Sequence, residues 1–193
     1  MVKEEIVFDI HSEFHMLRHF EVPDDLVIQN IIKNGYKKIQ IQSEIEFIGS
    51  RFFKSFACNI SDLLSQLLKF EYNIIEAANG NLVLEFLVPF ENYPYGIGTN
   101  SIISKKSLSN SEIERIYYLN NREYLIAHLD ISKLPITNVA SVIVKKVEDK
   151  FIFITAFPGI TAMPIPDNKM SNELFILSKK FWDEHVFLKI SIT

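Results

Sequence analysis

Residues 138–157, NVASVIVKKVEDKFIFITAF, decide the fold class of this chain. Two runs rich in β-branched and aromatic residues flank the short polar stretch Glu148-Asp149-Lys150, a pattern typical of two strands joined by a tight turn. Such residues pack well on a pleated surface. We therefore predict that residues 138–147 and 150–157 form a pair of strands at the centre of a sheet.

A second hairpin is predicted around Asn79-Gly80, which lies between Ile74-Ile75 and Leu82-Val83-Leu84. A two-residue type I′ turn requires positive φ at both central positions, and Asn-Gly satisfies this requirement best. The sequence therefore predicts that Asn79 and Gly80 are the two central residues of this turn.

The remaining elements follow from hydrophobic periodicity and capping residues. Further strands are predicted at residues 5–10, 37–47, 51–58, 124–129 and 186–192, and helices after Ser12, Asp24, Asn59, Ser111 and Ser171. Strands that arrive mostly as hairpins, with helices at irregular intervals, favour an α+β fold with a mixed or mainly antiparallel sheet and flanking helices.

Turn-forming residues concentrate between Pro89 and Thr99, so we expect a boundary there. The expected units are an acidic subdomain at residues 1–92 and a second one at 93–193, which together could form one compact domain. Residues 1–95 carry 14 acidic and 8 basic side chains, while residues 96–193 carry 10 acidic and 12 basic ones. A basic partner is thus expected on the first half and a polyanion on the second.

Composition excludes several protein classes. The 193 residues are 48% hydrophobic and 12% aromatic, which is unlike a disordered chain. One cysteine, Cys58, in an apolar context excludes a disulfide framework and argues against a nucleophilic thiol. No apolar run is long enough for a membrane span, and no signal peptide is seen, so we expect a soluble cytoplasmic protein.

No cofactor or metal is predicted. Gly96-Ile97-Gly98-Thr99 lacks the residues of a phosphate-binding loop, and we interpret it as a rigid turn. His11, His15 and His19 would stack on one helix face, where a metal site or a solvated polar face are both conceivable. We favour the polar face, because no acid or thiolate has a recognised ligand spacing.

From Tyr95 onward the chain resembles a family of small uncharacterised bacterial proteins. The resemblance rests on a Gly-Thr turn, an Arg (Arg122), Pro135-Ile136-Thr137, a strand ending in Thr155-Ala156-Phe157-Pro158-Gly159, a proline-rich loop and Phe181-Trp182-Asp183-Glu184-His185. More distantly, this half is similar at the level of fold to bacterial ribonuclease toxins of the barnase, EndoU, colicin and RelE type.

The distant similarity implies metal-independent RNA cleavage. His185 would act as acid or base, because imidazole titrates near neutrality. Arg122 would bind the phosphate together with either Lys145 or Lys146, since successive strand residues point to opposite faces of the sheet. Thr137 and Thr155 would donate hydroxyl hydrogen bonds.

Two functions therefore remain open. The first is a noncatalytic binding or inhibitory protein, such as an antitoxin, an immunity protein or a phage-encoded inhibitor, that uses its acidic first half against a protein partner. The alternative is a ribonuclease-like effector that acts on RNA. The net charge of -4 favours the first, because ribonuclease toxins are usually basic.

Overall fold

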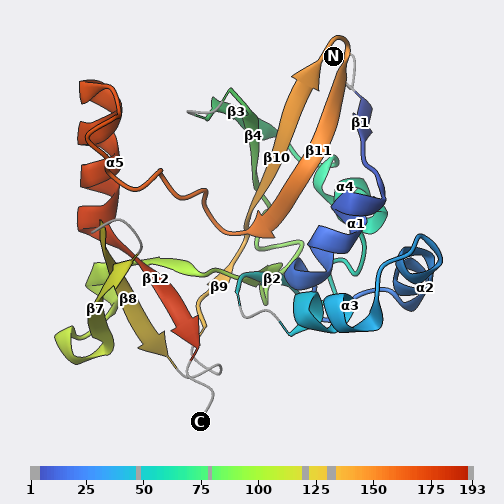
Figure 1. Cartoon of the computed structure of the whole chain (residues 1–193), viewed down its shortest axis with the longest axis horizontal. Coiled ribbons are helices and arrows are strands. Elements are labelled where there is room, and N and C mark those ends of the chain that lie inside the picture. The colour runs from blue at the N-terminus through green and yellow to red at the C-terminus, as the bar shows by residue number, and fades with distance from the viewer. Residues whose placement is uncertain (1–4, 47–48, 78–79, 119–121, 130–133, 191–193) are drawn as a thin grey trace. The chain divides into compact units, whose positions relative to one another are not determined.

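A computed structural model of the chain describes residues 5–46, 49–77, 80–118, 122–129 and 134–190; at 114–118, 122–129 and 188–190 it describes the backbone alone. The fold is α+β, as predicted (Figure 1). The chain divides into unit 1, residues 1–99 and 136–160, and unit 2, residues 100–135 and 161–193. This division differs from the predicted boundary between residues 92 and 93, because the hairpin at 139–158 belongs with strands of the first half.

Unit 1 is built on a mixed sheet with β10 at its centre. The strand order is β1 (Glu5–Val7), β11 (Lys150–Pro158), β10 (Val139–Val147), β4 (Leu82–Leu87) and β3 (Tyr72–Glu76). β1 runs parallel to β11, and the other neighbours are antiparallel. The predicted β10–β11 pair is therefore confirmed. A smaller sheet joins β2 (Arg51–Phe52), β5 (Gly98–Thr99) and β9 (Ile136–Thr137).

The helices of unit 1 are α1 (Ile10–Met16), the 3-10 turn η1 (Leu17–His19), α2 (Asp25–Lys33), α3 (Lys38–Ile45) and α4 (Ile60–Leu67). α1 and α4 share one core with the main sheet, where Met16, Leu63 and Leu67 are buried with Phe86, Val142 and Phe153. A second, smaller core joins Leu17, Ile31 and Ile41. Burial of these side chains is the main force that holds the unit together.

The β3–β4 hairpin is confirmed, but its turn is offset from the prediction. Ala77 N–H donates to Asn81 O at 2.8 Å, and Gly80 N–H donates to Ala77 O at 2.9 Å. Gly80 therefore closes a four-residue turn as its last member, whereas the type I′ prediction made it the third. The positive φ of Gly80, 78°, agrees with the prediction, and Asn79 lies outside the described residues.

The strand predicted at residues 37–47 is wrong, because this segment forms helix α3. Ile41 is buried in the second core while Ile39 is 75% exposed, which shows that burial here does not follow the alternation of isoleucines. Ile41 and Ile45 lie one helical turn apart and both contact that core. The Gln40 side chain accepts a hydrogen bond from Lys37 N–H at 2.9 Å and caps the helix start.

The strand predicted at residues 51–58 is shorter than expected. Only Arg51–Phe52 pairs as β2, and the chain then turns, since Ala57 N–H donates to Phe53 O at 3.1 Å. Asp24, Asn59 and Ser171 cap helices α2, α4 and α5 (Asn172–Glu184), at three of the predicted helix starts.

Unit 2 has its own sheet and one long helix. The strand order is β6 (Ile102–Ser104), β12 (His185–Ile190), β8 (Arg122–Leu129) and β7 (Ile113–Tyr118). β12 runs parallel to β8, and the other neighbours are antiparallel. Helix α5 (Asn172–Glu184) precedes β12, and short 3-10 turns η2 (Lys105–Ser107) and η3 (Asn110–Glu112) precede β7.

Candidate functional site

The residues predicted for RNA cleavage belong to two units. Thr137, Thr155, Lys145 and Lys146 lie in unit 1, while Arg122 and His185 lie in unit 2. That Arg122, Thr155 and His185 line one pocket stays a prediction, and the predicted residues are described below within each unit.

The hydroxyls of the two threonines predicted for the site, Thr137 and Thr155, have structural partners. Thr155 Oγ1 donates to Met16 Sδ at 3.8 Å, and Ala156 N–H donates to the same sulfur at 3.3 Å. Thr137 Oγ1 accepts from Val139 N–H at 3.0 Å. These contacts attach α1 to β11 and close the turn between β9 and β10, so each hydroxyl has a role in the fold.

Lys145 and Lys146 lie near the end of β10, opposite Ile152 and Phe151 of β11. Both side chains are exposed, and as successive strand residues they point to opposite faces of the sheet. At most one of them can therefore serve a site on either face, as the sequence indicated.

His185 is the first residue of β12 and packs against the end of α5. Its Nδ1 lies 2.9 Å from Phe181 O, and its ring stacks on that of Phe181 with 4.3 Å between centroids. Because a carbonyl oxygen only accepts, Nδ1 carries the proton, and Nε2 is the atom left as an acceptor. Arg122 begins β8, which runs parallel to β12, so both residues lie at the same end of this sheet.

The three histidines of the first helical segment have separate roles. The rings of His15 and His19 meet edge to face at 5.6 Å between centroids. His11 instead hydrogen-bonds to the hydroxyl of Tyr36, whose ring stacks on Phe14. Within the described part of the chain, no group of three or more His, Cys, Asp or Glu side chains could hold a metal ion.

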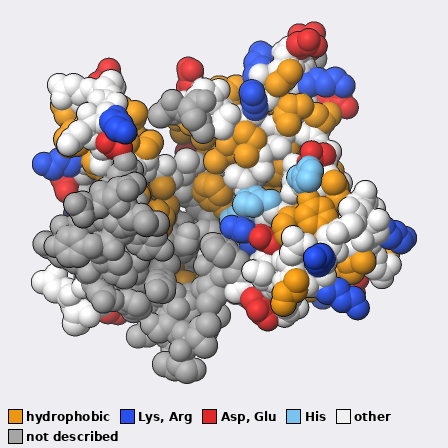
Figure 2. Space-filling view, viewed as in Figure 1, with side chains coloured by type: hydrophobic (Ala, Val, Ile, Leu, Met, Phe, Trp, Pro, Cys, Tyr) orange, Lys and Arg blue, Asp and Glu red, His pale blue; other side chains and the backbone are white. Residues whose placement is uncertain are grey.

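His19 is held in its neutral form. Burial lowers its pKa to about 4, while its Nδ1 lies 3.1 Å from Ser50 O and its ring contacts Phe157 at 6.1 Å between centroids. Burial lowers the pKa of His15 too, and the charge of Arg18 acts in the same direction. In Figure 2, histidine side chains lie among hydrophobic ones near α1 and the end of β11.

A bidentate ion pair fixes the segment that carries these histidines. Arg18 Nε lies 2.5 Å from one carboxylate oxygen of Glu44, and Arg18 Nη2 lies 2.7 Å from the other. Both side chains are largely buried, and the pair connects η1 to α3. Glu44 neutralises the charge of Arg18. The pair therefore stabilises the contact between η1 and α3 and offers little attraction to an anion.

Cys58 is a protonated thiol. Burial raises its pKa to about 11, and a hydrogen bond to Asp62 together with the charge of that carboxylate adds to the effect. The thiol donates to Asp62 Oδ2 at 3.3 Å. A thiolate nucleophile is thereby disfavoured, in agreement with the sequence analysis.

The Gly96-Ile97-Gly98-Thr99 segment is a packed turn. Gly96 has φ of 80°, and a Cβ atom on Gly98 would lie 2.4 Å from Arg51 O. Asn138 donates from its side chain to Val88 O at 3.0 Å and to Tyr93 O at 3.3 Å, which holds the preceding loop. Glycine is needed here for a left-handed conformation and a close backbone approach, so no phosphate is required to explain it.

In unit 2, Trp182 anchors the proline-rich loop. Its Nε1 donates to Met163 O at 3.0 Å and to Pro164 O at 3.2 Å. The ring also packs on Phe187, with 4.7 Å between centroids. Trp182 therefore has the structural role that a large aromatic residue with a polar end can fill.

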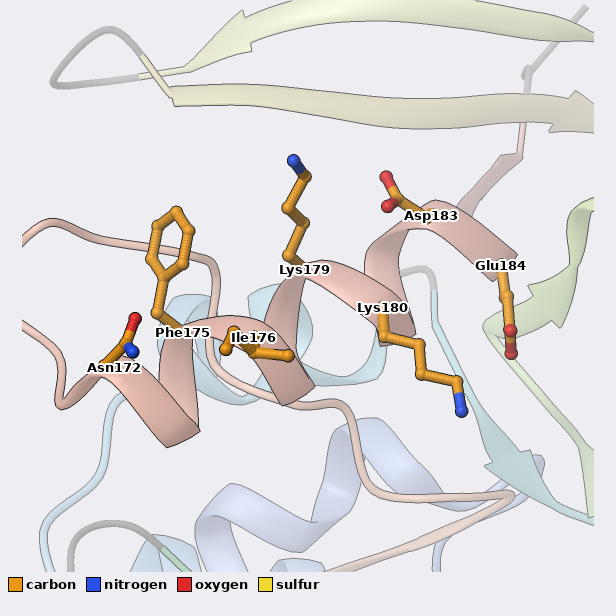
Figure 3. A pocket seen from close by; sticks show the side chains of 7 residues that line it. All are labelled: Asn172, Phe175, Ile176, Lys179, Lys180, Asp183 and Glu184. Carbon is orange, nitrogen blue, oxygen red and sulfur yellow. The ribbon is translucent and has the colours of Figure 1, made fainter.

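A shallow depression lies along the outer face of α5 (Figure 3). All its lining residues come from this one helix: Asn172, Phe175, Ile176, Lys179, Lys180, Asp183 and Glu184. Figure 3 shows Phe175, Lys179 and Asp183 in one row, with Lys180 and Glu184 pointing the other way. Two basic and two acidic side chains balance each other, so this face has no charge preference for an anionic substrate.

The feature that sequence reasoning missed is the exposed edge of the β3–β4 hairpin. Ile74 is 58% exposed, Ile75 is 47% exposed, and Leu87 at the end of β4 is 69% exposed. The sequence signal that could have revealed it is charge: residues 70–104 contain Glu71, Glu76, Glu85 and Glu91 and no Lys, Arg or His. The described part of this acidic segment that lies in unit 1, residues 70–77 and 80–99, is the candidate binding site.

Comparison with known proteins adds no relative: no family model, no curated protein and no solved structure matches the chain. Among the described residues, no helix combines the length and apolar character needed to cross a bilayer.

Proposed function

We propose that this chain is a noncatalytic binding protein whose unit 1 engages a basic region of a protein partner, as an antitoxin, an immunity protein or a phage-encoded inhibitor would. The observation that supports this proposal is the acidic segment 70–104, which includes the exposed apolar residues Ile74, Ile75 and Leu87.

Charge and apolar surface act together in such a site. Several glutamates with few basic side chains between them make the local electrostatic potential more negative. A negative potential speeds the encounter with a basic partner and disfavours an acidic one. Exposed apolar side chains then gain free energy when the partner removes them from water.

The chemistry of the histidines points in the same direction. His19 is kept neutral by burial, and His11 and His185 each engage Nδ1 in a contact that serves the fold. Thr155 and Thr137 likewise use their hydroxyls in contacts within unit 1.

One observation favours the alternative, a ribonuclease-like function. His185 Nε2 makes no hydrogen bond within the described residues, and Arg122 begins the neighbouring parallel strand at the same end of the sheet. Imidazole and guanidinium groups are together able to bind and cleave a phosphodiester.

A cleavage assay separates the two functions. The purified chain, His185→Ala and the control His11→Ala are incubated with total bacterial RNA and a fluorescent oligoribonucleotide. The binding proposal expects all three to leave the RNA equally intact. Cleavage by the wild type that is lost in His185→Ala and kept in His11→Ala would overturn it.

A binding assay tests the proposal directly. Proteins crosslinked to the chain in a bacterial lysate are identified, purified and measured individually for affinity. We expect binding that weakens with salt and falls in Glu71→Lys/Glu76→Lys. A charge-matched control, Asp25→Lys/Glu46→Lys, changes exposed acids elsewhere in unit 1 and should retain binding.

A further inference from the structure

We propose that the outer edge of β3 is the docking site, and that its occupant is an extended segment of the partner protein that adds to the main sheet as a strand and carries Lys or Arg at both ends. This inference rests on the proposed binding function and specifies its surface and mode.

The position of β3 in the sheet leaves one edge of the strand without a neighbouring strand among the described residues. β3 is the last strand of the order and pairs with β4 on its inner side. In an antiparallel ladder, the main-chain N–H and C=O groups of successive residues point alternately toward the neighbouring strand and away from it. The hydrogen bond from Ala77 N–H to Asn81 O shows that Ala77 points toward the partner strand, and this fixes the direction of the other residues of β3. The hydrogen bond from Val88 N–H to Asn138 O shows that Val88 points toward the β10 side of β4, and alternation from this residue gives the same assignment.

By this alternation, the main-chain groups that point toward β4 belong to Asn73 and Ile75. Those that point away from it belong to Tyr72, Ile74 and Glu76. No backbone hydrogen bond to these outward groups occurs in the part of the chain that the structure describes. Three residues with outward N–H and C=O groups are enough to pair with a short extended segment.

The edge strand contacts the core through one aromatic ring and exposes two isoleucines. The ring of Tyr72 packs on Phe86 with 5.0 Å between centroids and holds the strand against the core. Ile74 and Ile75 are exposed on opposite faces of the strand. Proteins usually block such an edge with Lys, Pro or a bulge, and β3 contains none of these.

The charges favour a basic occupant. Glu71 and Glu76 are exposed and stand at the two ends of β3. Lys69, two residues before Glu71, is exposed and donates from Nζ to Gln66 Oε1 at 2.8 Å. Within the sheet, Lys145 and Lys146 extend β10 beyond its last pair with β4, and β10 lies two strands inward. A second copy of the chain would add its own glutamates to this edge, whereas a segment with Lys or Arg at its ends would neutralise them.

The test uses a displayed library of random twelve-residue peptides, panned against the purified chain. Peptides that alternate apolar residues and carry basic ends should be enriched. On binding of an enriched synthetic peptide, hydrogen exchange should slow at the outward amides of Ile74 and Glu76 and change little at Asn73 and Ile75, which already pair with β4. The same peptide N-methylated at alternate amides should lose binding, since its charges and side chains remain but its edge cannot pair.

Variants of the chain provide the second measurement. We expect Glu71→Lys/Glu76→Lys to weaken peptide binding at least about tenfold, and Ile74→Pro to weaken it similarly by removing one outward N–H. Asp25→Lys/Glu46→Lys should bind as the wild type does. Circular dichroism tests whether each variant is folded. If Ile74→Pro does not fold, the charge variants alone test the inference.

Three results would overturn the inference. They are the absence of any enriched peptide, binding that leaves the β3 amides unprotected, and a dimer of the chain that Ile74→Pro dissociates. Peptide or protein binding that maps elsewhere would refute the edge site and leave the proposed function intact, while RNA cleavage that depends on His185 would refute the proposed function itself.

Discussion

The partly buried His19 makes the stability of unit 1 sensitive to acid. Burial lowers the folded-state pKa of this histidine from 6.5 to about 4. The unfolded chain therefore binds a proton at higher pH than the folded chain does. The resulting stabilisation of the folded state is complete above the unfolded pKa and is lost as the pH falls toward the folded one.

The size of the effect follows from the two pKa values. One pKa unit corresponds to about 1.4 kcal/mol, so lowering the pH from about 7 to about 5 should remove roughly 2 kcal/mol of unfolding free energy through His19 alone. A domain with an unfolding free energy of about 5–15 kcal/mol would lose a measurable part of it.

Urea unfolding across this pH range measures the effect in the wild type and in His19→Asn. Asparagine retains an N–H donor toward Ser50 O but does not titrate, so the variant should be less stable near neutrality and show a flatter dependence on pH. His11→Gln, which alters an exposed histidine of the same segment, is the matched control for the loss of an imidazole. An equal slope in wild type and His19→Asn would refute the reasoning, because His15, whose pKa is also lowered, would then carry the whole effect.

Three further predictions test the packing of unit 1 and the protonation of Cys58. Ile41→Ala should reduce stability by about 2–4 kcal/mol, because Ile41 is buried, whereas Ile39→Ala on the exposed face of α3 should change it by less than about 0.5 kcal/mol; equal losses in chemical denaturation would contradict the helix. Gly98→Ala should lower the unfolding free energy by about 1–3 kcal/mol, since the new methyl group would lie 2.4 Å from Arg51 O, and an unchanged melting temperature would show that the turn can widen. Cys58 should react slowly with iodoacetamide near neutral pH and faster only as the pH approaches about 11, and rapid alkylation of the folded protein at neutral pH would show that the thiolate is accessible.

Local rules were enough for many elements of this chain. The apolar run at 138–157 predicts the β10–β11 pair correctly, because β-branched and aromatic residues have few alternatives to a central sheet position. The helix starts at Asp24, Asn59 and Ser171 were predicted correctly, since each side chain needs only a backbone N–H two or three residues away to cap a helix. The structural roles of Cys58 and of the Gly96–Thr99 turn were also predictable from their neighbours in sequence.

Contacts between distant residues decided the rest. The spacing of Ile39, Ile41 and Ile45 fits a strand or a helix, and only the core around Leu17 and Ile31 selects the helix. The hairpin β10–β11 pairs with β4, more than 50 residues earlier, and this long-range pairing moves it into unit 1. No local pattern contains that information.

The candidate site also depends partly on the sequence and partly on the tertiary structure. The sequence alone determined that residues 70–104 are acidic and lack a basic side chain. That β3 lies at the end of the sheet was decided by tertiary structure, because the position of a strand depends on which partners the other strands take. The outward N–H and C=O groups of β3 are a consequence of that order, whereas the glutamates at its ends are a property of the sequence.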